Sequence, residues 1–124
     1  SEAAQRLLNE AARYLGTPYV WGGYSPSGFD CSGFVSYCLT NSGVRNTGRL
    51  TAQGLYDICT PVSQSEAQPG DLIFFTGTYD AGVPVTHIGI YVGNGQMIHC
   101  GHPVQYTSIN SPYWQSHFYG FGRW

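Results

Sequence analysis

The stretch HIGIYVGNGQMIHC (residues 87–100) decides the fold, because it contains two apolar segments joined by a turn. HIGIYVG (87–93) and QMIHC (96–100) have the composition of strands, and the Asn94-Gly95 pair between them is typical of a tight β-hairpin. Further strands are expected at LIFF (72–75), VQYTS (104–108) and HFYGFGRW (117–124). The C-terminal half is therefore predicted to form an antiparallel sheet.

The N-terminal half shows helical periodicity instead. Apolar residues recur every three or four positions across 2–15, and Gly16 followed by Pro18 ends the pattern. A second helix is expected through 31–43 after the capping residue Asp30, and a short third helix over Thr51–Ile58. Helices followed by strands define an α+β domain, in which N-terminal helices pack on a C-terminal antiparallel β-sheet. We interpret residues 1–124 as a single domain.

The composition is that of a folded domain with few charges. Hydrophobic residues make up 42% of the 124 residues and charged residues only 10%, which excludes a disordered chain. The net charge is −2 and no basic stripe is present, so nucleic acid is not an expected partner. No segment is long and apolar enough to span a bilayer. Ser1 begins a polar helical pattern rather than a signal peptide, so the chain is interpreted as mature or excised, and we expect it to be part of a longer protein.

The four cysteines, at positions 31, 38, 59 and 100, form no CxxC pair, which argues against a zinc knuckle. Cys31 and Cys38 lie two turns apart on one predicted helix, about 10 Å along its axis, too far for a disulfide. A Cys59–Cys100 disulfide stays open, but free buried thiols are favoured.

Cys31 is the candidate nucleophile because it follows Asp30 in the first turn of a predicted helix. Unpaired backbone N–H groups and the helix dipole favour a thiolate at that position, so a lowered pKa is expected. Ser32 and Gly33 are small and are expected to leave room for a substrate. Placement alone supports a buried packing cysteine about equally well. The other three cysteines fit packing better.

His87 and His99 are the candidate base and its orienting partner. A strict two-residue turn would pair His99 with Ile90 and place the two histidines on opposite faces. A three-residue loop would pair His99 with Tyr91 and place them on the same face, and the residues alone do not decide between these registers. A metal site is the competing use of the pair, but acidic ligands nearby are sparse. His102 and His117 are interpreted as surface or packing residues.

Together these segments resemble the NlpC/P60 family of papain-like cysteine peptidases. The resemblance covers nearly the whole chain and rests on GTPYVWGG (16–23), FDCSGFVSYCL (29–39), RLTAQ (49–53), PGDLIFF (69–75), THIGIYVGNGQMIHC (86–100) and FYGFGRW (118–124). DCSG alone would be a weak signal. DCSGF followed by HIGIYVG and a later histidine is a specific combination.

The resemblance implies a papain-like α+β fold and a role for each matched residue. Cys31 matches the nucleophile, His87 the base and His99 the polar residue that orients the base, which favours the same-face register. The residues matched to oxyanion or substrate binding are Tyr19, Trp21, Asp30, Ser32, Arg49 and Thr51. Asp30 would then act both as a helix cap and at the substrate. Leu50 departs from the polar residue that some relatives carry there.

The implied reaction is hydrolysis of the γ-D-glutamyl–diamino acid bond in the stem peptide of bacterial peptidoglycan, through an acyl-enzyme. No metal or organic cofactor is required for it. A secreted or cell-wall-associated location follows from where this substrate lies, and other domains are expected to supply targeting. Two alternatives stay open: a CHAP-like N-acetylmuramoyl-L-alanine amidase with the same cysteine and histidine, and a non-catalytic wall-binding module.

Overall fold

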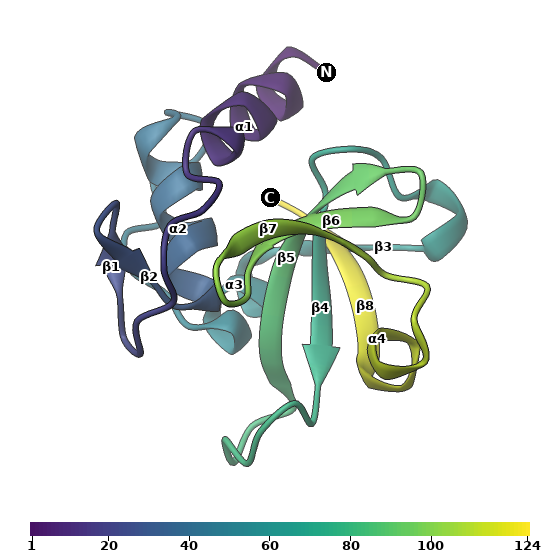
Figure 1. Ribbon diagram of the computed structural model, residues 1–124. Helices are drawn as coiled ribbons and strands as arrows, with labels where there is room; N and C mark the ends of the chain where they lie inside the picture. The colour runs from purple at the N-terminus through teal and green to yellow at the C-terminus, as the bar shows by residue number, and fades with distance from the viewer.

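Three helices form the N-terminal half of the computed structural model, which describes all 124 residues (Figure 1). They are α1 (Glu2–Ala12), α2 (Cys31–Asn41) and α3 (Ala52–Ile58). Each begins after a side chain that accepts a hydrogen bond from a first-turn N–H: Ser1, Asp30 and Thr51. The three helix predictions are confirmed, although α1 ends earlier than expected. Residues 13–16 form a turn there, with Gly16 in the left-handed region at φ 87°.

Six antiparallel strands form the sheet, in the order β3-β8-β4-β5-β6-β7. They are β3 (Thr60–Val62), β4 (Leu72–Thr76), β5 (Val85–Gly93), β6 (Gln96–Cys100), β7 (Val104–Ser108) and β8 (Phe118–Arg123). The α+β class and the five predicted strand regions are confirmed. The sequence did not predict β3, the small hairpin of β1 (Tyr24–Ser25) and β2 (Gly28–Phe29), a 3₁₀ turn (Gln64–Glu66), or α4 (Pro112–His117).

The two faces of the sheet bury different side chains. Leu72 and Phe74 of β4 point into the main core, which α1, α2 and α3 cover. Ile73 and Phe75 alternate to the opposite face and pack in a smaller cluster with Trp114 of α4. Figure 1 shows α1 and α2 to one side of the sheet and α4 beside β8. No helix has the length and apolar character needed to cross a membrane.

The β5–β6 hairpin follows neither register considered from the sequence. The two-residue turn is retained, because Gly93 pairs with Gln96. Tyr91 then pairs with Met97, so Val92 is an extra residue in β5 with no partner in β6. This is a β-bulge, which shifts the pairing of the remaining strand by one residue.

The bulge puts His99 opposite Gly89 instead of Ile90 or Tyr91, so both predicted pairings are wrong. Since 87 and 89 lie on the same side of β5, the same-face arrangement of His87 and His99 is nevertheless confirmed. Gly89 matters here because a Cβ atom at this position would lie 3.2 Å from the His99 Cβ and 2.8 Å from the Met97 sulfur. A larger residue would therefore disturb the histidine pair.

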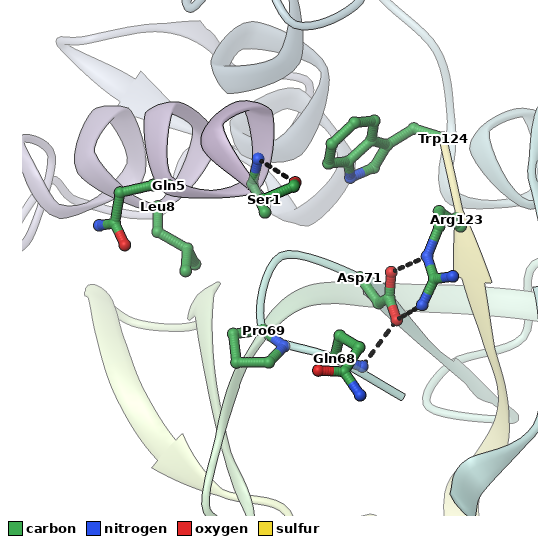
Figure 2. A pocket seen from close by; sticks show the side chains of 9 residues that line it. Ser1, Gln5, Leu8, Gln68, Pro69, Asp71, Arg123 and Trp124 are labelled. Atoms are coloured by element: carbon green, nitrogen blue, oxygen red, sulfur yellow. Dashed lines mark hydrogen bonds and ion pairs between the residues drawn. The ribbon is translucent and has the colours of Figure 1, made fainter. Parts of the chain in front are cut away.

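The end of β8 is fastened beside the start of α1, as Figure 2 shows. Arg123 donates to Asp71 through Nε at 2.8 Å and through a terminal nitrogen at 2.7 Å, and the Trp124 indole donates to the Gly70 carbonyl. Asp71 also accepts from the Gln68 backbone N–H at 2.8 Å. A hollow of about 470 Å³ lies there. The buried charge in this hollow is the Asp71 carboxylate, which is already paired with Arg123. The ion pair therefore holds the end of β8 in place.

Candidate active site

A cleft of about 580 Å³ holds Cys31. Its walls come from the 17–30 loop, the first turn of α2, the 49–57 segment and the loop that joins β4 to β5. The predicted site residues that line it are Tyr19, Trp21, Asp30, Cys31, Ser32, Arg49 and Thr51. The structure therefore brings together all residues assigned to the substrate side, whereas their roles stay predictions. His87 and His99 are not part of the lining.

Cys31 is the first residue of α2, directly after the N-cap Asp30, as the sequence predicts. Its Sγ lies 3.9 Å from the carbonyl oxygen of Thr86, the residue before His87. The register between β4 and β5 shifts at this point, because Phe75 pairs with His87 while the next residue of β4 pairs with Val85. Thr86 is thus the extra residue of a second bulge, which joins the thiol to the histidine strand.

The expected low pKa of Cys31 is wrong for this structure. Burial is the main cause that raises the pKa of the thiol to about 11, and the neighbouring Asp30 carboxylate adds to it. Hydrogen bonds from the backbone N–H groups of Ser32 and Ile88 act in the opposite direction but do not compensate. The helix start therefore provides donors to the sulfur, while burial keeps the resting thiol protonated.

His87 and His99 form a hydrogen-bonded pair, with 2.9 Å between Nε2 of His87 and Nδ1 of His99. No hydrogen bond occupies Nδ1 of His87, which leaves that nitrogen available to a substrate or thiol proton. Burial and the second histidine lower the pKa of His87 to about 3, and burial lowers that of His99 to about 4. Both rings are thus neutral near pH 7, as a base and its partner require.

Trp114 covers the histidine pair and was missed from the sequence. Its ring stacks on His87 at 5.1 Å and 30° and meets His99 edge-on at 5.4 Å. Ser111 caps α4 by accepting from the Trp114 backbone N–H, and Pro112 is the first helical residue. A Ser-Pro helix start was thus the signal that could have found this element.

Tyr19, Trp21 and Tyr79 give the cleft aromatic walls. Trp21 is 74% exposed and meets Tyr79 edge-on at 5.6 Å. Tyr79, on the loop between β4 and β5, was not identified from the sequence. Burial and the nearby Cys31 raise the pKa of Tyr19 to about 12, so its phenol keeps its proton and can donate a hydrogen bond.

Asp30, Ser32 and Arg49 form a linked polar group at the edge of the cleft. One Asp30 oxygen accepts from the Gly33 N–H at 2.7 Å as the helix cap, and the other accepts from Arg49 at 2.5 Å. Arg49 also donates to the hydroxyl of Ser32, which is buried. Thr51 caps α3. Arg49 has the most exposed side chain of this group. Its guanidinium is held in place by its hydrogen bonds to Asp30 and Ser32.

Gly33 does not leave room for a substrate, contrary to expectation. A Cβ atom there would lie 1.9 Å from the carbonyl oxygen of Gly23. The glycine instead lets the start of α2 pack directly on the aromatic loop before it. The backbone N–H of Asp30 donates to the same Gly23 oxygen at 3.1 Å, which fixes the loop against the helix.

The remaining cysteines and histidines lie outside this arrangement. All four cysteines are free thiols, and Cys38 and Cys100 are buried. His117 bonds the Thr76 carbonyl at 2.7 Å and His102 is exposed, in line with their interpretation as packing and surface residues. No group of three or more potential ligands converges on a point that could hold a metal ion.

Comparison with known proteins shows which family has this arrangement. The sequence pattern of the NlpC/P60 family matches residues 16–123. The chain is 44% identical to the bifunctional muramidase/DL-endopeptidase CwlT of Bacillus subtilis, over 96% of this chain and 36% of CwlT. It is 39% identical to the murein DD-endopeptidase MepH of Escherichia coli, over 98% of this chain and 46% of MepH.

A solved structure gives the same answer. The crystal structure of a lipoprotein-like protein of the NLP/P60 family from Staphylococcus aureus superposes with a TM-score of 0.93 at 44% identity, over 99% of this chain and 41% of that one. The chain therefore belongs to the NlpC/P60 family. It spans less than half the length of each of these relatives.

Proposed function

We propose that this domain is a cysteine endopeptidase that hydrolyses the γ-D-glutamyl–diamino acid bond of bacterial peptidoglycan stem peptides. The observation that carries the proposal is that the cleft thiol of Cys31 contacts β5 at Thr86, next to His87, and that His87 is hydrogen-bonded to His99 of β6. The DL-endopeptidase in the name of CwlT supports this bond, whereas the name of MepH, a DD-endopeptidase, supports only the coarser reading of a peptidoglycan endopeptidase. The substrate implies a secreted or cell-wall-associated location, with targeting by parts of a longer chain.

The first step is attack by Cys31 on the γ-carbonyl carbon of D-glutamate. At rest both partners are neutral, because burial raises the pKa of the thiol and lowers that of His87. His87 therefore takes the thiol proton on Nδ1 as the sulfur attacks, and acts as a general base rather than as part of a resting ion pair. The N–H groups of Ser32 and Ile88 stabilise negative charge on the sulfur until the bond forms.

The remaining steps return both groups to their starting state. The backbone N–H of Cys31 and the Tyr19 phenol stabilise the oxyanion of the tetrahedral intermediate. His87 gives its proton to the departing amine of the diamino acid, which leaves a thioester on Cys31. His87 then deprotonates a water molecule that attacks the thioester, and the new carboxylate and the thiol are released. This scheme requires no metal or organic cofactor.

The polar edge and the aromatic walls of the cleft are assigned to the stem peptide. Trp21 forms one wall, and Thr51 borders the cleft at the start of α3. Arg49 faces the substrate, since it is the most exposed charge of its group. Asp30 and Ser32 act at the substrate chiefly by holding Arg49, because their oxygens are already engaged.

The test is mass spectrometry of the stem tetrapeptide L-Ala-γ-D-Glu-diamino acid-D-Ala after incubation with the wild-type domain, Cys31→Ala and the control Cys59→Ala. The proposal expects a cut after D-Glu with the wild type and the control, and none with Cys31→Ala. Parallel digests with diaminopimelate and with lysine as the diamino acid identify the preferred wall type.

Three other results would each assign a different activity to the domain. Release of intact stem peptide from muramic acid in whole peptidoglycan would indicate the amidase. A cut only at the D-Ala cross-link of a muropeptide dimer would match the activity in the name of MepH. A domain that binds peptidoglycan before and after alkylation of Cys31, and cleaves nothing, would be a binding module.

A further inference from the structure

The hydrogen-bond chain of the histidine pair does not end at His99. Nε2 of His99 lies 2.9 Å from Oγ1 of Thr107, on β7 at the edge of the sheet. Met97 pairs with Thr107, so strand alternation places His99 and Thr107 on the same face. His99 is only 4% exposed, whereas Thr107 is half-buried. The chain therefore ends at the hydroxyl of a half-buried residue on the edge strand.

We propose that Thr107 is a positioning residue for the base His87, acting through His99. The inference rests on the proposed function, in which Nδ1 of His87 receives the thiol proton. Thr107 acts by fixing which nitrogens of the two neutral rings carry hydrogen.

The productive arrangement follows from the two hydrogen bonds. If Nδ1 of His87 is to accept a proton, the neutral ring must carry its hydrogen on Nε2 and donate it to Nδ1 of His99. The neutral His99 ring must then carry its hydrogen on Nε2, and Thr107 accepts it. The reverse arrangement would place a hydrogen on Nδ1 of His87, where it would block the base.

The surroundings make Thr107 the group that satisfies this N–H. Trp114 packs edge-on against the His99 ring, and Met97 belongs to the same apolar cluster. No other hydrogen bond reaches Nε2 of His99. Without the hydroxyl, the productive arrangement would leave a buried N–H unpaired, which is costly. A hydroxyl both accepts and donates, so the Thr107 Oγ1 can accept this hydrogen bond and still has a hydrogen of its own to donate.

Thr107 also stabilises the protonated form of His87, which exists after His87 has taken the proton of Cys31. When His87 becomes an imidazolium, its Nε2–H is a stronger donor to His99, which in turn donates more strongly to Thr107. The effect belongs to the chemical step, because the charge on His87 exists only after the thiol has given up its proton. Loss of the hydroxyl should therefore lower kcat and leave KM unchanged.

The experiment compares Thr107→Val, which replaces the hydroxyl by a methyl group, with Thr107→Ser, which keeps it. Thr60→Val, on the opposite edge strand β3, is the matched control. We expect Thr107→Val to lower kcat roughly tenfold at unchanged KM, the change that corresponds to one neutral hydrogen bond. Thr107→Ser and the control should keep wild-type kcat. Equal losses in the Val and Ser variants, or no loss in either, would overturn the proposal.

A second measurement does not depend on turnover or on how the variants fold. Nitrogen-15 NMR of histidine-labelled wild-type protein near pH 7 reports which ring nitrogen carries hydrogen. The proposal expects hydrogen on Nε2 of both His87 and His99, and hydrogen on Nδ1 of His99 would refute it. If Cys31→Ala kept full activity, the proposed function would fail, while this NMR result would still show whether the two rings carry hydrogen as the hydrogen bond to Thr107 requires.

Discussion

The indole of Trp114 stacks on the imidazole of His87 with 5.1 Å between ring centres and 30° between ring planes. The same indole meets His99 edge-on, so one side chain shields both histidines from solvent. This shielding contributes to the burial that lowers the pKa of His87 to about 3.

Trp114→Leu should admit water to the histidine pair and raise the pKa of His87 toward its ordinary value of 6.5. His87 cannot act as a base once it is protonated. A higher pKa of His87 should therefore move the acid limb of the kcat/KM profile to higher pH. The measurement is the pH profile of stem-peptide cleavage, with Tyr106→Leu, an exposed aromatic residue on β7, as the control. An unchanged acid limb in Trp114→Leu would contradict the shielding role.

Asp30→Asn should lower the pKa of Cys31, because the Asp30 carboxylate raises it. Asparagine still caps the helix, so the fold should persist, and Arg49 would be left with its charge unpaired beside the cleft. The rate of alkylation of Cys31 as a function of pH reports the thiol pKa. Asp57→Asn, at an exposed position of the same cleft, serves as the control. A thiol pKa that stays the same or rises would show that the carboxylate does not act on the sulfur.

Tyr19→Phe should lower kcat on the order of 10²-fold if the phenol donates to the oxyanion. KM should change little, because this interaction strengthens only as negative charge develops. The comparison is Tyr79→Phe, a second tyrosine of the same cleft, which should keep wild-type kcat. Steady-state kinetics with the stem tetrapeptide separate the two parameters. Equal kcat values for the two variants would remove Tyr19 from the oxyanion site.

Gly33→Ala should destabilise the fold, because the added methyl group would lie 1.9 Å from the Gly23 carbonyl oxygen. Overpacking of this kind costs about 1–3 kcal/mol or more of the free energy of unfolding. Gly54→Ala in α3 is the matched control, since its nearest neighbour would be the end of the Thr51 side chain at 3.3 Å, and the substitution should cost far less than Gly33→Ala. Urea unfolding measures both, and a Gly33→Ala variant as stable as the wild type would contradict the close packing.

Acid should destabilise the domain through His87 and His99. The folded pKa values of His87 and His99, about 3 and about 4, lie below the ordinary 6.5, so the unfolded chain binds more protons at intermediate pH. Their full contribution to stability is present above pH 6.5 and is lost as the pH falls toward the folded values.

His99→Gln removes one of these titrating groups and keeps a polar side chain between His87 and Thr107. Its free energy of unfolding should fall less steeply between pH 6.5 and pH 4, by up to about 1.4 kcal/mol per pH unit relative to wild type. Urea unfolding at several pH values tests this. Parallel curves for the two proteins would exclude His99 as a source of acid instability.

The sequence by itself determined the elements whose signals are local. Asp30 and Thr51 cap helices because their side chains accept first-turn N–H groups a few residues away. Asn94-Gly95 forms the predicted tight turn, with both residues at positive φ. The position of Cys31 as the first residue of α2 follows from its cap, and family membership follows from motifs that can be read along the chain.

Only the tertiary structure decided how these elements meet. The bulge at Val92 set the face of His99, and pairing between distant strands, not the turn, produced it. The pKa of Cys31 went up because the protein around it excludes water, which outweighs the helix start. Trp114 and Thr107 reach the histidines from elements that are separate in sequence. Capping and turn chemistry act over a few residues, whereas register, burial and hydrogen-bond partners depend on segments that only folding brings together.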